Sequence, residues 1–290
     1  MAKYKIYSVE GNRQRLDGGA MFGNVPHAVW SKWIAPDERM RIPLACRAFL
    51  IHHLETDRRI LLDAGIGCAF APKLRDRFGV HEASHRLLEN LAARGVQPEQ
   101  IDAVILSHLH FDHAGGLLSA WREDNEPELV FPSARVIVHR RAWKRAIEPH
   151  ARDRASFLPA LNSLLEQSGR LELIGESMDL LGKDFSSVVS DGHTPGLLLT
   201  SLTTEEGGVV FCGDLIPGAP WVHLPVTMGY DRFPELLIDE KTSFVEQARQ
   251  KGRHLLFTHD PNLAACKVER GEKGKYRATD GRAELDGLEL

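Results

Sequence analysis

The residue types best suited to chemistry in this chain gather in one short stretch. Residues 107 to 113 read Ser-His-Leu-His-Phe-Asp-His, so three histidines and one aspartate stand within seven positions. Imidazole nitrogens and carboxylate oxygens are the ligands that zinc prefers in sites that keep one position open for water. A loop that is rich in histidine by chance would rarely reach this density. The stretch therefore predicts a metal-binding loop.

The residues around this loop indicate how it is positioned. The largely apolar run 101–106 is typical of a short buried strand, so the loop begins where that strand ends. His108 and His110, two positions apart, can face one point, while Asp112 and His113 turn toward a second. One loop could thus serve two neighbouring metal ions.

Further ligand candidates occur next to three other predicted strands. Each one alone is more typical of a capping or hydrogen-bonded core residue, but together with the first cluster they predict the remaining ligands of a metal site. They are His193, before the run 197–202; Asp214, after the run 209–212; and His259, after the run 254–257.

In their order along the chain, these motifs resemble those of the metallo-β-lactamase superfamily. That superfamily carries HxHxDH, a histidine of the GHTPG type, a Gly-Asp aspartate and a late histidine, and residues 61–67 resemble its early Asp-x-Gly motif. The resemblance extends from about residue 45 to 262. It implies one ion held by His108, His110 and His193, a second held by Asp112, His113 and His259, and Asp214 as the bridging ligand.

The resemblance also gives Asp63 a role outside the ligand set. Asp63 would orient a ligand histidine through the ring nitrogen that does not bind metal, as carboxylates near metal sites commonly do. The alternative for Asp63 is a capping residue in a strand-to-loop turn.

Two divalent ions about 3.5–4 Å apart can share a bridging hydroxide, which attacks an ester, lactone, thioester, amide or phosphoester. Metal binding lowers the pKa of the water from far above neutral towards roughly 7, so no separate base is needed. Two Zn²⁺ ions are expected, since His110 stands where the redox-active flavodiiron branch usually carries Glu. Mn²⁺, Co²⁺ or Fe²⁺ are alternatives. Asp112 and Asp214 would take part in catalysis as ligands.

The substrate must be inferred from residues outside the cluster. The string Ser-His-Leu-His-Phe-Asp-His-Ala-Gly-Gly resembles that of acyl-homoserine lactonases, and methyl-parathion-hydrolase-like phosphotriesterases carry a similar one. Many of those lactonases have a tyrosine three residues after the bridging aspartate, where this chain has Pro217. Tyr230 or His223 could replace it as a general acid or carbonyl donor. The alternative for Tyr230 is an aromatic side chain that anchors its loop.

An N-terminal loop, about residues 18–36, is predicted to wall the substrate pocket. It is rich in glycine and carries Met21, Phe22 and Trp30, while Trp221 could form the opposite wall. Such a pocket would accept an acyl chain or an aryl leaving group. The alternative is that these aromatic side chains pack against the first sheet. Exposed aromatic residues in this loop would also suit a homodimer contact.

Composition limits the other function classes. The chain has 290 residues, 43% of them hydrophobic, which suits a single domain over 1–290. A net charge of −4 gives no indication of a nucleic-acid or anionic-membrane partner. No apolar run of about 18 residues and no signal-peptide core are present. Four cysteines without CxxC spacing are typical of reduced thiols in a cytoplasmic protein.

The hydrophobic pattern predicts both strands and helices along the whole chain. The resemblance implies an α/β fold, an αββα sandwich of two mixed β-sheets flanked by helices, with the metals at one edge between the sheets. The tail 267–290, charged and rich in glycine, would form a closing hairpin or be partly mobile. Strands are expected near 44–53, 59–63, 102–107 and 135–139, and helices near 83–94, 142–147, 158–167 and 234–250.

These observations predict a dinuclear zinc-dependent hydrolase that opens a hydrophobic ester or lactone, with acyl-homoserine lactones, the substrates of quorum quenching, as the specific candidates. The first alternative is a phosphotriesterase that uses the same site. A glutathione-thioester hydrolase is disfavoured because Leu197 stands where that type usually has another histidine. A non-catalytic metal-binding sensor or scaffold of the same fold is disfavoured because every expected ligand is present.

Overall fold

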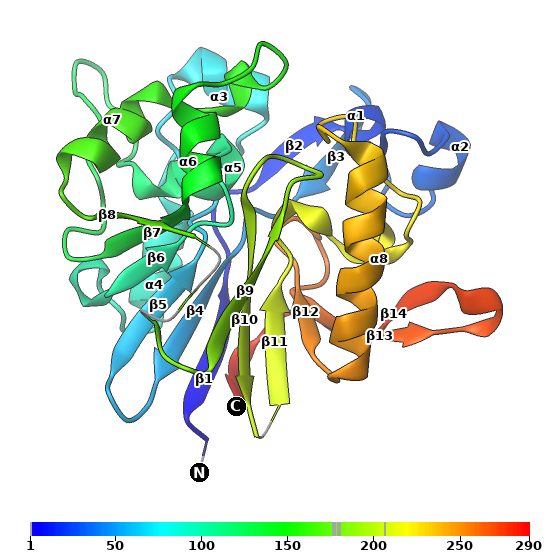
Figure 1. Cartoon of the computed structure of the whole chain (residues 1–290). Helices are drawn as coiled ribbons and strands as arrows, with labels where there is room; N and C mark the ends of the chain where they lie inside the picture. The colour runs from blue at the N-terminus through cyan, green and yellow to red at the C-terminus, as the bar shows by residue number, and fades with distance from the viewer. Residues whose placement is uncertain (1, 176–177, 179–180, 206) are drawn as a thin grey trace.

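Two β-sheets face each other in the middle of the molecule, and helices cover both outer faces (Figure 1). The computed structural model describes residues 2–175, 178, 181–205 and 207–290. Within these ranges the first sheet has seven strands, in the spatial order β15 (Asp286–Glu289), β1 (Tyr4–Val9), β4 (Ala48–His53), β5 (Arg58–Leu62), β6 (Ala103–Ile105), β7 (Arg135–His139) and β8 (Leu171–Ile174). The second has six, in the order β14 (Tyr276–Arg282), β13 (Ala265–Arg270), β12 (His254–Leu256), β11 (Gly207–Phe211), β10 (Leu197–Thr204) and β9 (Phe185–Ser190).

Both sheets are mixed. Strands β5 to β8 run parallel to one another, and β11 is parallel to β12, while the remaining pairs within these two sheets are antiparallel. A separate antiparallel ribbon consists of β2 (Gln14–Asp17) and β3 (Arg41–Leu44).

The helices form the outer layers and one edge of the molecule. On the first sheet lie α4 (Arg86–Ala93), α6 (Arg140–Ile147) and α7 (Pro159–Gln167), and on the second lies α8 (Pro234–Gln250). Three short helices, α1 (Gly18–Phe22), α2 (His27–Trp30) and α3 (Pro72–Phe78), lie in the upper part of Figure 1, and a fourth, α5 (Phe111–Ala114), lies within the stretch that carries the histidine cluster. None of the helices in the described ranges is long and apolar enough to cross a bilayer.

Side-chain alternation along β4 shows why the sheets need cover on both faces. Phe49 packs between the sheets, where its ring centroid lies 5.7 Å from that of Phe211. Its neighbour Leu50 points to the other face and packs in the same cluster as Leu87 and Leu91 of α4. A strand with both faces buried reads as a continuous hydrophobic run, because successive side chains point to opposite faces.

The predicted αββα sandwich is confirmed, with changes at several element boundaries. The strand expected at 44–53 is interrupted after β3 and resumes at β4, since the amides of Ala45 and Arg47 donate instead to the carbonyls of His259 and Thr258. The tail forms the β13–β14 hairpin and then β15, which pairs with β1. The expectation of a plain loop at 18–36 is wrong, because this segment contains α1 and α2, the first capped by the Asp17 carboxylate.

The predicted ligands gather at one edge because several strands end there. Asp63, His108, Asp214 and His259 each follow the carboxyl end of a strand, namely β5, β6, β11 and β12 respectively. His193 lies before β10, which runs antiparallel to β11, so the start of β10 meets the end of β11. The sheet topology therefore brings side chains that are far apart in sequence to one place.

Two loops of this edge approach closely through glycine. The amide of Ala64 donates to the carbonyl of His113 at 2.8 Å, and that of Gly116 donates to Gly65 at 2.9 Å. A Cβ at Gly116 would lie 1.9 Å from the carbonyl oxygen of Ala64, which is backbone and has no room to move aside. Gly116 therefore holds the loop of Asp63 against the loop of the histidine cluster.

We expect Gly116→Ala to destabilise the protein by about 1–3 kcal/mol, the usual cost of overpacking. The thermal midpoint should fall by roughly 2–4 °C per kcal/mol, as measured by scanning calorimetry. The control is Gly271→Ala, where the added Cβ would have its nearest neighbour at 3.6 Å and the backbone φ is −81°. A Gly116→Ala midpoint equal to that of the control would contradict the close-approach argument.

Candidate metal centre

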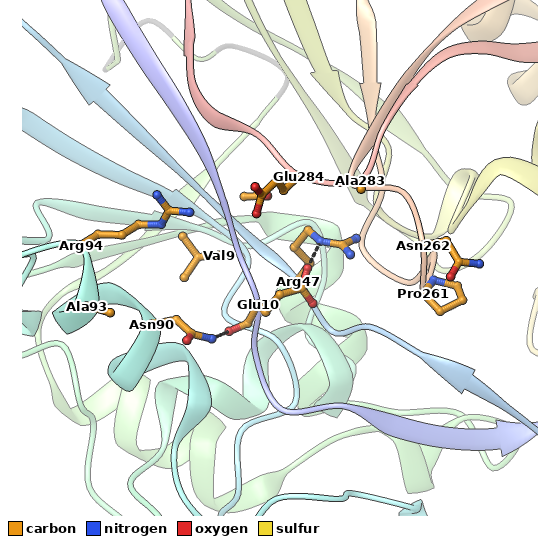
Figure 2. A pocket seen from close by; sticks show the side chains of 11 residues that line it. Val9, Glu10, Arg47, Asn90, Ala93, Arg94, Pro261, Asn262, Ala283 and Glu284 are labelled. Carbon is orange, nitrogen blue, oxygen red and sulfur yellow. Dashed lines mark hydrogen bonds and ion pairs between the residues drawn. The ribbon is translucent and has the colours of Figure 1, made fainter.

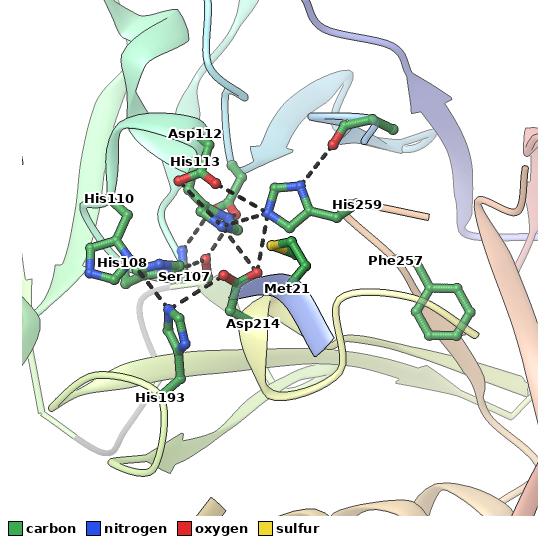
Figure 3. Close-up of polar contacts among 12 residues, drawn as sticks. Met21, Ser107, His108, His110, Asp112, His113, His193, Asp214, Phe257 and His259 are labelled. Carbon is green, nitrogen blue, oxygen red and sulfur yellow. Dashed lines mark hydrogen bonds and ion pairs between the residues drawn. The ribbon is translucent and has the colours of Figure 1, made fainter. Parts of the chain in front are cut away.

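The seven predicted ligand side chains lie together in the structure, and each is at most 9% exposed. In Figure 3, His108, His110 and His193 lie on one side, Asp112, His113 and His259 lie on the other, and Asp214 is between them. Their potential ligand atoms form three groups in which all atoms are within 4.8 Å of one another: His108, His110 and His193; His108, His113 and Asp214; and Asp112, His113 and His259.

Asp214 connects the two sides through its two carboxylate oxygens. Oδ1 lies 3.1 Å from Nε2 of His113 and 3.3 Å from Nε2 of His259. Oδ2 lies 3.3 Å from Nε2 of His193. Because each oxygen faces a different group of histidines, this carboxylate has the geometry of a ligand shared by two ions.

Four ligand histidines have a partner on the ring nitrogen that faces away from the cluster, and for His108 this partner is the hydroxyl of Ser107, 3.1 Å from Nδ1. Nδ1 of His113 donates to the Asp63 carboxylate at 2.7 Å, which gives Asp63 the contact expected of it. Nδ1 of His193 donates to Asp231 at 2.8 Å, and Nδ1 of His259 donates to the backbone carbonyl of Ala45 at 2.7 Å. These contacts hold each Nε2 toward the centre, as partners of metal-binding histidines usually do.

Asp63 and Asp231 are themselves held in place. Asp63 accepts from the amide and hydroxyl of Ser107 at 2.6 and 2.8 Å, and its φ of 56° lies in the left-handed region that non-glycine residues rarely adopt. Asp231 also accepts from the amide of Met228 at 2.7 Å. Gln14, fully buried in β2, donates to Asp112 at 3.1 Å.

Sequence reasoning missed Asp231, Gln14 and the Ala45 carbonyl. Gln14 lies in an unremarkable strand far from the cluster in sequence, and a backbone carbonyl leaves no signature in residue type. Asp231 follows Tyr230, which was already a candidate, so its carboxylate was the one available signal.

The electrostatics of the cluster favour a cation. Burial would raise the pKa of Asp214, but His113, His259 and His193 hold it well below its usual value. Burial would likewise lower the pKa of His113, whereas the carboxylates of Asp214 and Asp112 raise it to about 10. Burial and the neighbouring histidines lower the pKa of His108 and His110 well below the usual value, so both rings are neutral.

The residues fit a pair of divalent ions. Nε2 of His108 and Nε2 of His110 are buried and have no hydrogen-bond partner in the described part of the chain. A buried polar atom left unpaired costs about 1–3 kcal/mol, so a group of them around one point calls for a ligand. Neutral imidazoles and carboxylates are donors that zinc accepts, and metal ions would satisfy these atoms.

A cavity of about 180 Å³ opens above the cluster. Its polar floor includes His110, Asp112, His193, Asp214 and His259. Its other lining residues are mainly apolar, namely Leu16, Met21, Phe78, Phe111, Ala155, Ser156, Met228 and Tyr230.

Among the candidates for the pocket, Met21 and Tyr230 line the cavity. Three other candidates, Phe22, Trp30 and Trp221, are not among the described residues that line the cavity. Each of them is at most 2% exposed. The Phe22 ring is stacked between Trp221 and Trp30, with centroid distances of 4.4 and 5.6 Å. The expectation that these three side chains wall the pocket is therefore corrected: they form a stack that holds α1, and Met21 is the residue of α1 that reaches the cavity.

His223 also lies outside the described lining of the cavity. It ends the short turn Ala219–Val222, and its backbone carbonyl faces the ammonium of Lys241 at 3.5 Å. Of the two candidates for a carbonyl donor, Tyr230 is the one at the cavity.

Comparison with known proteins gives a consistent result. Residues 41–259 match the family model described as "Metallo-beta-lactamase superfamily". An N-acyl homoserine lactonase of Bacillus thuringiensis is 24% identical over 292 residues, which cover 92% of this chain and 98% of the lactonase.

Solved structures share the whole architecture. A probable metal-dependent hydrolase from Staphylococcus aureus has a TM-score of 0.85 at 26% identity, over 100% of this chain and 98% of its own. The dizinc quorum-quenching lactonase AidC, in complex with the product N-hexanoyl-L-homoserine, has a TM-score of 0.73 at 18% identity, over 96% and 94% of the two chains.

We expect metal uptake by the metal-free protein to release protons. The raised pKa of His113 keeps this ring protonated at pH 7.5, and a metal ion must displace the proton to reach the nitrogen lone pair. Affinity should therefore increase as the pH rises from 7 toward 10, by about tenfold per pH unit for each proton displaced. Calorimetric titration in two buffers of different ionisation enthalpy measures the release, and equal heats in both buffers would refute it.

Proposed function

The chain belongs to the metallo-β-lactamase superfamily and is a metal-dependent hydrolase, and from this premise we propose that it uses two zinc ions to hydrolyse a hydrophobic lactone or ester. Acyl-homoserine lactones are the proposed substrate class. Support for this class comes from the N-acyl homoserine lactonase that aligns over 92% of the chain. Mn²⁺, Co²⁺ and Fe²⁺ remain alternatives to zinc.

The observation that carries the proposal is the position of the apolar cavity. Its floor includes Asp214 and members of both ligand groups, namely His110, His193, Asp112 and His259, and its walls include Leu16, Met21 and Met228. An apolar acyl chain would lie along these walls while its carbonyl carbon faces the floor. A small, strongly charged substrate would find few partners there.

Bound divalent ions at this floor supply Lewis acidity, which lowers the pKa of water and polarises the oxygen of the group under attack. The chain's own residues orient the side chains that would bind these ions. Asp63, Asp231 and the Ala45 carbonyl fix three imidazole rings, and the buried carboxylates of Asp112 and Asp214 supply negative charge toward the cations.

Tyr230 is proposed as the hydrogen-bond donor to the substrate. Tyr230 is 41% exposed, and its partial burial together with the carboxylates of Asp112 and Asp17 raises the pKa of its phenol, so the hydroxyl keeps its proton at neutral pH. A neutral phenol at the cavity can donate to a carbonyl oxygen as negative charge develops on it. Tyr230 would thus replace the tyrosine that Pro217 does not provide.

The competing activity is hydrolysis of a phosphotriester at the same floor, where a tetrahedral phosphorus would replace the carbonyl carbon. The apolar walls would suit its aryl group as well as an acyl chain, so a direct comparison of substrates has to decide.

The homodimer predicted from the exposed aromatics of the N-terminal segment also stays a prediction, and gel filtration with light scattering tests it.

We expect the zinc-loaded protein to hydrolyse a long-chain acyl-homoserine lactone with a kcat/KM above about 10⁴ M⁻¹s⁻¹, within the usual range of enzymes. An aryl dialkyl phosphate should react far more slowly, and Asp214→Asn should remove the lactonase activity. The reverse order of the two substrates would assign the chain to the phosphotriesterases. Turnover of neither substrate by protein with two bound ions would refute the proposed substrate class.

We expect Tyr230→Phe to lower kcat for the lactone by about 10²-fold, as removal of a single carbonyl donor typically does. KM should change less, because the aromatic ring stays in the cavity wall. The matched variant His223→Gln should keep the wild-type kcat, and steady-state kinetics at pH 7.5 measures both. Loss of kcat in His223→Gln with full activity in Tyr230→Phe would transfer the donor role to His223.

A further inference from the structure

Arg47 is a buried cation that the proposed reaction does not use. It is 2% exposed, and its Nε pairs with the carboxylate of Glu10 (Figure 2). Both residues line a groove of about 660 Å³, and within the described ranges this groove shares no lining residue with the cavity above the metal centre. Arg47 can therefore influence the metal centre only through the protein that lies between them.

Three further hydrogen bonds of the guanidinium go to one segment of backbone. Nη1 donates to the carbonyls of Phe257 at 2.9 Å and Leu263 at 3.3 Å, and Nη2 donates to that of Asp260 at 3.2 Å. Phe257 and Asp260 lie on either side of His259. The planar guanidinium thus spans the turn that carries this histidine.

The backbone next to Arg47 holds the same turn. The amide of Arg47 donates to Thr258 at 3.1 Å, and that of Ala45 donates to His259 at 3.2 Å. In return, Nδ1 of His259 donates to the Ala45 carbonyl at 2.7 Å. The position of the His259 ring is consequently defined by residues 45–47, and the Arg47 side chain ties this segment to both sides of the turn.

We propose that Arg47 is a positioning residue for the second metal ion, because its guanidinium fixes the turn that presents Nε2 of His259. In this position Nε2 lies 3.5 Å from Asp112 and 3.3 Å from Asp214. The inference rests on the metal pair of the proposed function and adds a residue to it. Lysine cannot substitute fully, since a single ammonium lacks the rigid fork that reaches several carbonyls at once.

The effect should be unequal for the two ions. His108, His110 and His193 come from the loop after β6 and the turn before β10. In the described structure, the hydrogen bonds of the Arg47 side chain go to Glu10 and to the segment 257–263. Loss of the guanidinium therefore acts on one side of the metal centre. A general loss of protein stability would instead weaken the binding of both ions.

The test is competitive titration of the metal-free protein with Zn²⁺ against a chromophoric chelator, which yields two dissociation constants. We expect Arg47→Lys to weaken the binding of one zinc ion by about 10–100-fold, the usual effect of losing a group that orients a ligand. The dissociation constant of the other zinc ion should stay unchanged. Elemental analysis after dialysis should then give one retained zinc instead of two. Arg47→Gln replaces Arg47→Lys if the latter does not fold, as judged by circular dichroism.

Arg170→Lys is the matched control. Arg170 also donates through Nη1 to two backbone carbonyls, those of Phe131 at 2.6 Å and Ala134 at 2.8 Å, but neither belongs to a segment with a ligand residue. Both zinc constants should stay at the wild-type values in this variant. In a His259→Gln background, adding Arg47→Lys should leave the remaining ion unaffected, because the two changes act through one residue.

Three outcomes would each overturn the inference. Arg47→Lys could keep both wild-type zinc dissociation constants, or it could weaken the binding of both ions equally. In the His259→Gln background, adding Arg47→Lys could weaken the binding of the remaining ion further. If the wild-type protein binds two ions but hydrolyses neither lactone nor phosphotriester, the substrate proposal fails and the inference about Arg47 stands on its metal readout. If the wild type hydrolyses the lactone while Arg47→Lys keeps both ions, the inference alone fails. Fewer than two ions in the wild type would overturn both.

Discussion

A carboxylate buried among imidazole rings is the interaction on which the rest of this structure depends. Removing the charge of Asp214 from water costs several kcal/mol unless partners surround it, and its partners come from three different segments of the chain. The strands that deliver these segments must end at one edge, which requires both the parallel pairing of β11 with β12 and the antiparallel return of β10. His113 comes from the loop after β6 of the first sheet, so the surroundings of this one charge depend on the way both sheets end at the same edge.

The ligand residues could be predicted from sequence because their residue types are rare at such density and each stands next to an apolar run. The helix 234–250 and the strand 135–139 were predicted at their observed bounds, since proline, glycine and strict hydrophobic patterns mark those ends. The residues that orient the ligands could not be predicted in the same way. Gln14 contacts Asp112 across 98 positions of sequence, and nothing in its local pattern indicates that contact.

The N-terminal segment shows a second limit of sequence reasoning. Glycine and aromatic residues were compatible with a loop around the pocket and with packing against the first sheet, whereas the structure packs Phe22 and Trp30 in one cluster with Leu197 and Val210 of the second sheet. Phe22 stacks between two tryptophans, while its neighbour Met21 faces the cavity. Composition alone cannot distinguish two adjacent residues of a helix, because the direction of each side chain depends on where the helix lies.

The separation between the walls of the cavity and its floor has a consequence for how such a protein can evolve. Leu16 and Met21 precede the first sheet's central strands, and Met228 and Tyr230 lie in a later segment, whereas strand-end histidines and carboxylates make the floor, and of the named wall residues only Phe111 stands within the histidine cluster. Single substitutions in the walls change the shape offered to a substrate without altering a metal ligand. Substrate range and the metal centre can therefore be selected independently, so that descendants of one ancestral centre can diverge in what they hydrolyse.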